Sequence, residues 1–153
     1  MEVSRVRALR GPNLWSRHTA IEAIVECTPA ECSIPGLNGF EGRLRALFPE
    51  VGSLLEPGGR AEDVSLAHVL TAVALALQAQ AGCPVTFSRT NATPEPGVYQ
   101  VVFEYTEEDV GRLAFDHAQA LVRAAEAGGS FDVVGAVAEL HELDEDTRLG
   151  PST

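Results

Sequence analysis

The stretch from residue 65 to 82, SLAHVLTAVALALQAQAG, constrains the fold more than any other part of the chain, because almost all of its side chains are apolar. A helix of this composition must be buried over most of its surface, so the other elements have to surround it. It approaches the length of a membrane-spanning helix, but no arginine or aromatic girdle flanks it. Polar residues also interrupt it, namely Ser65, His68, Thr71, Gln78 and Gln80. We therefore expect a buried core helix, with Asp63 as its N-cap and Gly82 just beyond its C-terminal end.

The charge balance limits the classes of partner. The 153 residues fit one domain with a formal net charge of −11, and all eleven basic residues are arginine. Nucleic acids and anionic membranes need a basic footprint, so neither is expected as a partner, whereas a cationic partner would suit the chain. The odd number of cysteines (Cys27, Cys32 and Cys83) and an opening without an apolar segment predict reduced thiols and a cytoplasmic protein.

Hydrophobic periodicity predicts the remaining elements. Alternation predicts antiparallel partner strands at 2–9 and 19–27, joined after a turn at 10–13, and further strands at 84–90 and 97–105. The last of these has apolar residues on both faces and is expected to be central. Helical spacing predicts helices at 37–48, 107–129 and 131–146, the last capped by Asp132. The fold class is therefore α+β, an antiparallel or mixed sheet of about four strands with helices packed mainly on one face.

His68 is the one imidazole on the apolar helix, and its neighbours do not make a metal site. Two zinc ligands on a helix normally stand one turn apart on the same face. From His68 the one-turn neighbours are Thr71 and Ala72, and two turns on lies Ala76. Thr is a poor zinc donor and Ala has none, so spacing indicates a histidine with a structural role and predicts no metal, no cofactor and no catalytic residue. The other histidines, His18, His117 and His141, lie on separate segments, and no spacing predicts that they meet.

Several segments together resemble a known family. They are LRGPNLWS at 9–16, IPG at 34–36 ahead of an "RL" helix, EPGVYQVVFEYTEE at 95–108 and RLGPST at 148–153. In this order they are similar to the N-terminal domain of cyanophycin synthetase and span nearly the whole chain. The resemblance implies that residues 1–147 form this domain and that 148–153 begin a linker toward an absent ATP-grasp domain.

The resemblance also implies a function. Full-length members are ATP-dependent ligases that make a poly-aspartate chain with arginine branches. Their ATP-grasp and Mur-ligase-like domains form the bonds, and the N-terminal domain is associated with holding the polymer. We therefore expect a non-catalytic accessory domain whose partners are arginyl-poly-aspartate, or cyanophycin, and the ligase domains.

Some members carry a metal-dependent hydrolytic site in this domain, on a helix of the form His-x-x-Glu-His-x-x-x-Glu, which cuts polymer into primers. In the corresponding stretch of this chain His68 remains, whereas Thr71, Ala72 and Ala76 stand where the resemblance expects Glu, His and Glu. It is thus interpreted as a degenerate site without metal. The alternatives are a hydrolase that uses a rearranged site and a purely structural interaction domain.

The acidic surplus has a possible role in this setting, because carboxylates receive guanidinium groups in bidentate fashion. The expected polymer-binding residues are Glu104, Glu107 and Glu108, at the end of the best-matching segment, with Arg89 for the polymer's aspartate carboxylates.

Overall fold

The computed structural model describes residues 1–11, 19–52, 54 and 60–149, and these contain four strands and four α-helices. They are β1 (Glu2–Leu9), β2 (Ala20–Glu26), α1 (Phe40–Leu47), α2 (Leu66–Gln80), β3 (Ser88–Ala92), β4 (Val98–Glu104), α3 (Glu108–Ala127) and α4 (Val133–Leu149). Short 3₁₀ turns occupy 29–32, 34–36, 49–51 and 61–63. Residues 12 and 13 of the expected turn at 10–13, and residues 150–153 of the closing RLGPST, lie outside the described residues.

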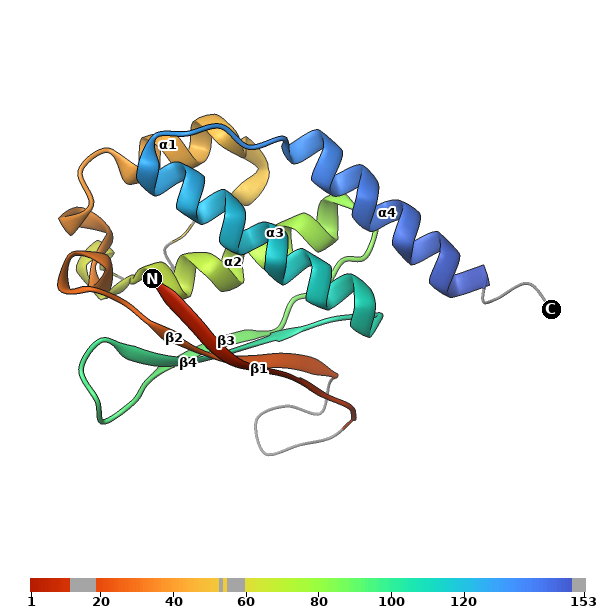
Figure 1. Ribbon diagram of the computed structural model, residues 1–153, viewed down its shortest axis with the longest axis horizontal. Coiled ribbons are helices and arrows are strands. Elements are labelled where there is room, and N and C mark those ends of the chain that lie inside the picture. The colour runs from red at the N-terminus through yellow and green to blue at the C-terminus, as the bar shows by residue number, and fades with distance from the viewer. Residues whose placement is uncertain (12–18, 53, 55–59, 150–153) are drawn as a thin grey trace.

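The four strands form one sheet in the order β1-β2-β4-β3, and every neighbouring pair is antiparallel. The helices lie together on one face of this sheet (Figure 1). The α+β prediction is therefore confirmed, as is the central position of β4 between β2 and β3. No helix in the described ranges has both the length and the apolarity needed to cross a bilayer.

Helix α2 is the buried core helix that its composition predicts. Leu66, Val69, Leu70, Val73 and Leu77 are all fully buried. It contacts α3, α4 and the inner face of β3 and β4, so neighbours cover most of its circumference. Each buried Leu or Val side chain contributes about 1.5–3 kcal/mol relative to an exposed one, which makes α2 the main organiser of the helical layer.

The start of α2 corrects one prediction. The N-cap is Ser65 rather than Asp63, which ends the preceding 3₁₀ turn. The reason is the capping box: the Ser65 side chain accepts from the main chain of His68, and the His68 ring accepts from the main-chain N–H of Ser65. At the other end Gly82 follows the C-cap Ala81 with φ +89°, a conformation that favours glycine, as predicted.

Two other element boundaries differ from the prediction for local reasons. Strand β3 begins at Ser88 instead of residue 84, because the main-chain N–H groups of Thr86 and Phe87 donate to the Glu104 side chain. Helix α1 begins at Phe40, since Gly39 before it has φ +74° and cannot be part of the helix. At α4, Asp132 accepts from the main-chain N–H of Gly135 at 2.9 Å, as its predicted capping role requires.

Candidate functional site

His68 is held as part of the end of its own helix. Its Nδ1 lies 3.1 Å from the main-chain nitrogen of Ser65, which donates to it, and 2.9 Å from Ser65 Oγ. Its ring also meets the ring of Tyr99 on β4 edge-on, with centroids 6.0 Å apart. Nδ1 of His68 accepts this hydrogen bond as part of the capping box at the start of α2, so His68 has a structural role.

The three positions that follow His68 on α2 do not complete a metal site. The Thr71 hydroxyl donates to the main-chain carbonyl of His68 at 2.9 Å, and the residue is 3% exposed. Ala72 and Ala76 continue the same flank of the helix and offer only methyl groups. These residues do not fit a divalent cation, which needs about three oxygen, nitrogen or sulfur donors from the protein. Across the described ranges, no group of three His, Cys, Asp or Glu side chains is placed to hold a metal ion.

The other histidines of the described residues lie in separate surroundings. His117 on α3 packs against the ring of Phe131 with centroids 6.0 Å apart, and its Nε2 lies 3.5 Å from Glu139. His141 on α4 has its Nδ1 3.0 Å from the carbonyl of Ala81. Each of them joins α4 to a neighbouring element, whereas His18 lies outside the described residues.

Two of the predicted polymer-binding residues share one face of the sheet. The register pairs Arg89 on β3 with Val102 on β4, and Glu104 follows two residues later on the same face. This is the face opposite the helices, which we call the outer face; its described side chains include Arg7, Glu22, Arg89, Asn91, Gln100, Val102 and Glu104. Arg89 is exposed, and its Nε donates to Asn91 Oδ1 at 3.2 Å. One guanidinium and one carboxylate therefore lie close together at the β3 end of the sheet.

The other two predicted residues lie on the first turn of α3. Glu107 is its N-cap residue, where the main-chain carbonyl accepts from Gly111. Glu108 accepts from Arg10 at 2.6 and 3.0 Å and from Arg112 at 3.2 Å. Hydrogen bonds from these two guanidinium groups lower the pKa of Glu108 to about 2. Glu108 is thus already neutralised by arginines of its own chain, whereas the Glu104 side chain accepts from the main-chain N–H groups of Thr86 and Phe87.

The outer face also has a polar network that sequence reasoning missed. Glu22, only 8% exposed, accepts from Arg7 Nε at 2.6 Å and from Gln100 Nε2 at 3.0 Å. The signal for it is the position of Glu22 between the apolar residues Ile21 and Ala23 of β2, since a carboxylate buried there requires partners. Its partners come from β1 and β4 and depend on the strand register, which the sequence does not show.

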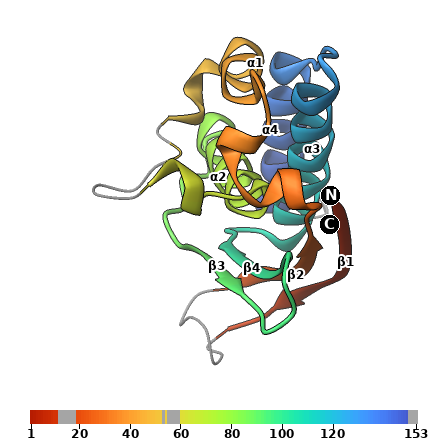
Figure 2. The same cartoon turned by 90° about the vertical axis from the view of Figure 1, so that its left-hand side faces the viewer.

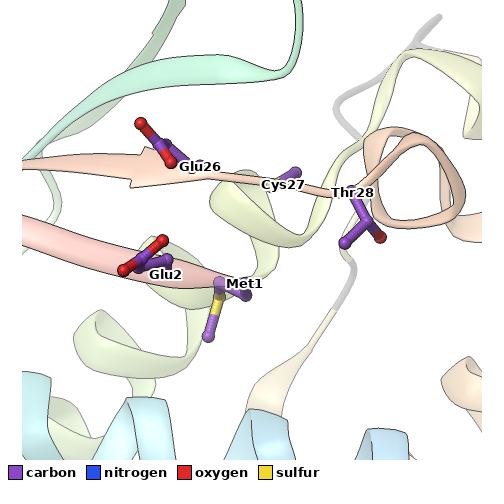
Figure 3. Close-up of a pocket in the computed structure, with 5 residues that line it drawn as sticks. All are labelled: Met1, Glu2, Glu26, Cys27 and Thr28. Carbon is purple, nitrogen blue, oxygen red and sulfur yellow. The ribbon is translucent and has the colours of Figure 1, made fainter.

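A pocket of about 440 Å³ opens at the end of β1 and β2, lined by Met1, Glu2, Glu26, Cys27 and Thr28 (Figure 3). Glu2 and Glu26 stand directly opposite each other on the two strands. Two like charges in that position repel each other, so a cation placed between them would relieve the repulsion. None of Cys27, Cys32 and Cys83 forms a disulfide, and burial raises the pKa of Cys27 to about 11, so its thiol keeps its proton at neutral pH.

Beside this pocket, the N-terminal ammonium group lies 2.7 and 2.9 Å from the two carboxylate oxygens of Glu31. Glu31 also meets Glu126 at the end of α3. Burial and the neighbouring Glu31 raise the pKa of Glu126 to about 7. Burial alone would raise the pKa of Glu31 too, but hydrogen bonds from Glu126 and from the ammonium group lower it to about 2. The two carboxyl groups therefore share one proton across the junction of the 29–32 turn and α3.

The fold and this arrangement define a class: a small α+β domain with charged groups on the outer face of its sheet and, among its described residues, no assembled metal centre. The sequence profile of the cyanophycin synthase-like N-terminal domain matches residues 23–126, and the chain belongs to this family.

Curated relatives extend this match to the whole chain. The cyanophycin synthetase of Trichormus variabilis is 36% identical over 171 residues, an alignment that covers 100% of this chain and 18% of the relative. The cyanophycin synthetase of Synechocystis sp. is 33% identical and that of Geminocystis herdmanii 34%, each with 100% of this chain and 19% of the relative covered. The chain thus spans less than a fifth of the length of these relatives and corresponds to their N-terminal domain.

Proposed function

We propose that the chain is a non-catalytic accessory domain of the cyanophycin-synthetase type, which holds arginyl-poly-aspartate and docks on ATP-dependent ligase domains in the cytoplasm. Residues 1–147 would form the domain and 148–153 the start of a linker toward an ATP-grasp domain. The observation that carries the proposal is the combination of a full-length family match with a hydroxyl and two methyl groups beside His68. The sequence match covers the whole chain, whereas Thr71, Ala72 and Ala76 do not supply a set of ligands for a hydrolytic metal.

The charges of the outer face support binding of this polymer. An arginine joined through an amide to an aspartate side chain keeps its guanidinium and its own carboxylate, so each branch carries both signs. Arg89 would receive a carboxylate and Glu104 a guanidinium, each by charge-assisted hydrogen bonds. Glu2 and Glu26 would offer a second place for a guanidinium, since the two carboxylates line the pocket from opposite positions on β1 and β2.

Isothermal titration of the chain with soluble arginyl-poly-aspartate segments tests polymer binding. We expect binding that weakens as salt is added, and a loss of about tenfold in affinity for Arg89→Glu. Arg123→Glu makes the same charge change at an exposed position of α3, on the helical side, and serves as the matched control. Absence of heat at low salt, or equal losses for both variants, would contradict polymer binding at the outer face.

Metal analysis of the purified chain tests the non-catalytic part of the proposal. We expect no stoichiometric zinc, and no shortening of the polymer that a chelator abolishes. Stoichiometric zinc that departs in His68→Ala would instead support a hydrolase with a rearranged site. Cross-linking to ligase domains, without any binding of polymer, would leave the chain as a structural interaction domain.

A further inference from the structure

Strand β3 is an edge strand whose hydrogen bonds to β4 use only every second residue. The main-chain carbonyl of Phe87 accepts from Glu104, and the main-chain N–H of Thr93 donates to Val98. Bonded and non-bonded pairs alternate in an antiparallel ladder, so 89 and 91 are the other two bonded positions of β3. The N–H and C=O groups of Ser88, Thr90 and Ala92 therefore point away from β4, and β4 is the only strand of the described ranges that pairs with β3.

In the described residues, the β1 edge of the sheet is irregular, whereas the β3 edge is regular. In β1 the register shifts between Ser4 and Arg7, and Arg5 inside this bulge has φ +52°. A bulge and charged side chains are common means by which proteins prevent an edge from pairing with another chain. The register of β3 is unbroken from Ser88 to Ala92, and its sequence SRTNA is small and polar apart from Arg89.

Residues that could contact an added strand lie on both sides of the β3 edge. On the outer side lie Arg89 and Glu104, one group of each sign. On the inner side lies α2, which contacts both β3 and β4. It runs along β4, since His68 meets Tyr99 at one end and Gln78 donates to the Glu104 carbonyl at the other. Figure 2 shows α2 and β3 on the same side of the molecule, away from β1 and α3.

The flank of α2 formed by His68, Ala72 and Ala76 is only partly buried, in contrast to the fully buried Leu70, Val73 and Leu77. Ala72 and Ala76 present only methyl groups on this flank. An extended peptide added to β3 projects alternate side chains to the two faces of the sheet. One set of branches would thus meet Arg89 and Glu104, and the other set would meet the small side chains of this flank.

We infer that the free edge of β3 binds the main chain of arginyl-poly-aspartate as an additional strand, with the polymer's branches alternating between the outer face and the partly exposed flank of α2. This rests on the proposed function and states which groups of polymer and protein meet. Main-chain hydrogen bonds would supply affinity for an extended peptide, and the charges beside the edge would select one with branches of both signs.

Amide hydrogen exchange followed by NMR tests the inference on the whole chain. Addition of a short synthetic arginyl-poly-aspartate segment should slow exchange at Ser88, Thr90 and Ala92 and leave Arg89 and Asn91, already bonded to β4, nearly unchanged. Binding by titration without this alternating protection would overturn the inference and leave the proposed function standing. Absence of any binding would overturn both. Protection that grows with protein concentration in the absence of polymer would show that a second copy of the chain takes the edge.

A pair of variants at one position provides a second measurement. Thr90→Pro removes an N–H that points away from β4, a place where an edge strand tolerates proline. It should weaken segment binding about tenfold, while the control Thr90→Val keeps the N–H and should bind as the unchanged chain does. Equal affinities for the two variants, both shown to be folded by circular dichroism, would contradict the inference.

Modified segments keep the test independent of the folding of a variant. Only alternate residues of an added strand face β3, so N-methylation of every second residue should be tolerated in one register. N-methylation of consecutive residues should abolish binding, although the charges of the branches are the same. Equal binding of both segments would show that charge alone is recognised and that the strand edge is not used.

Discussion

The two faces of the central strand β4 differ in the burial and polarity of their side chains. Val101 and Phe103 point toward the helices and are fully buried in the core. Gln100 and Glu104 point to the outer face, are partly exposed and make polar contacts through their side chains. Val102 is the exception, since it is fully buried although it belongs to the outer face. Neighbouring residues of β4 therefore have different roles: those on the inner face pack in the core, and those on the outer face are mainly polar or charged.

This difference indicates where the chain can change without loss of its fold. On the inner face a side chain must fill a fixed volume between α2, α3 and the sheet. On the outer face the requirement is that a polar group finds a partner, as Glu22 does with Arg7 and Gln100. Binding of charged polymer at the outer face and at the β3 edge would therefore conflict little with stability, which the inner face supplies.

The largest expected effect is on the inner face. Phe103→Ala should lower the free energy of unfolding by about 4 kcal/mol, because a fully buried ring is replaced by a cavity. The ring packs against that of Phe115 on α3 with centroids 5.3 Å apart, so the loss also weakens the contact between sheet and helices. Urea denaturation measures it. A loss below about 1 kcal/mol would show that the helical layer does not depend on this face.

The contrast between the inner and outer faces of β4 can be predicted from the sequence only in part. Alternation within β4 and the apolar composition of α2 are local properties, and they correctly predict a central strand, a core helix and an α+β fold. The cap at Ser65 depends on a histidine as the reciprocal partner, a role that Glu or Gln usually fills, and it was therefore missed.

In the candidate site, too, features set by spacing along one helix can be predicted from the sequence, whereas features set by strand register cannot. The spacing of His68, Thr71 and Ala72 along one helix is enough to predict that ligands are absent from that flank. The proximity of Arg89 and Glu104 requires the register of β3 on β4, and the Glu22 network requires that of β1, which contains a bulge. A bulge moves every later residue of a strand to a new partner, and nothing in EVSRVRAL indicates its position.

The next effect concerns the outer face. Glu22→Ala should destabilise the fold by about 1–2 kcal/mol, since Arg7 and Gln100 lose the carboxylate that accepts from them. Glu22→Gln keeps an acceptor in place and should cost less. Both are measured by urea denaturation beside Phe103→Ala. If Glu22→Ala were as harmful as Phe103→Ala, the outer face would be part of the core and the contrast between the faces would fail.

A smaller effect is expected at the Glu31 and Glu126 pair, which lies outside both faces. The folded-state pKa of Glu126, about 7, is above its usual value of 4.5, so its proton stabilises the fold fully below about pH 4.5. This contribution is lost as pH rises through about 7. The pKa of Glu31 is lowered to about 2, so its carboxylate stabilises the fold at neutral pH. This contribution is lost only as pH falls toward 2. Stability should therefore decline between about pH 5 and 8, by less than about 1 kcal/mol because solvent screens a partly exposed group.

Thermal denaturation across this pH range measures the decline. Glu126→Gln puts a neutral amide, which donates hydrogen bonds and does not titrate, at this position and should flatten the curve. Glu142→Gln, at an exposed position of α4, should leave the curve unchanged. A decline that persists in Glu126→Gln would mean that another group carries it.

The smallest effect on stability is expected at Arg89, where the effect on binding should nevertheless be clear. Its side chain is exposed and makes one hydrogen bond of 3.2 Å to Asn91, so Arg89→Ala should change the free energy of unfolding by less than about 0.5 kcal/mol. The same variant should bind arginyl-poly-aspartate several-fold more weakly. Phe103→Ala should show the reverse at temperatures where it is still folded, with a large loss of stability and nearly unchanged affinity. Because the two residues lie on adjacent strands and on opposite faces, equal effects of both variants on affinity would mean that polymer binding depends on the integrity of the whole sheet rather than on its outer face.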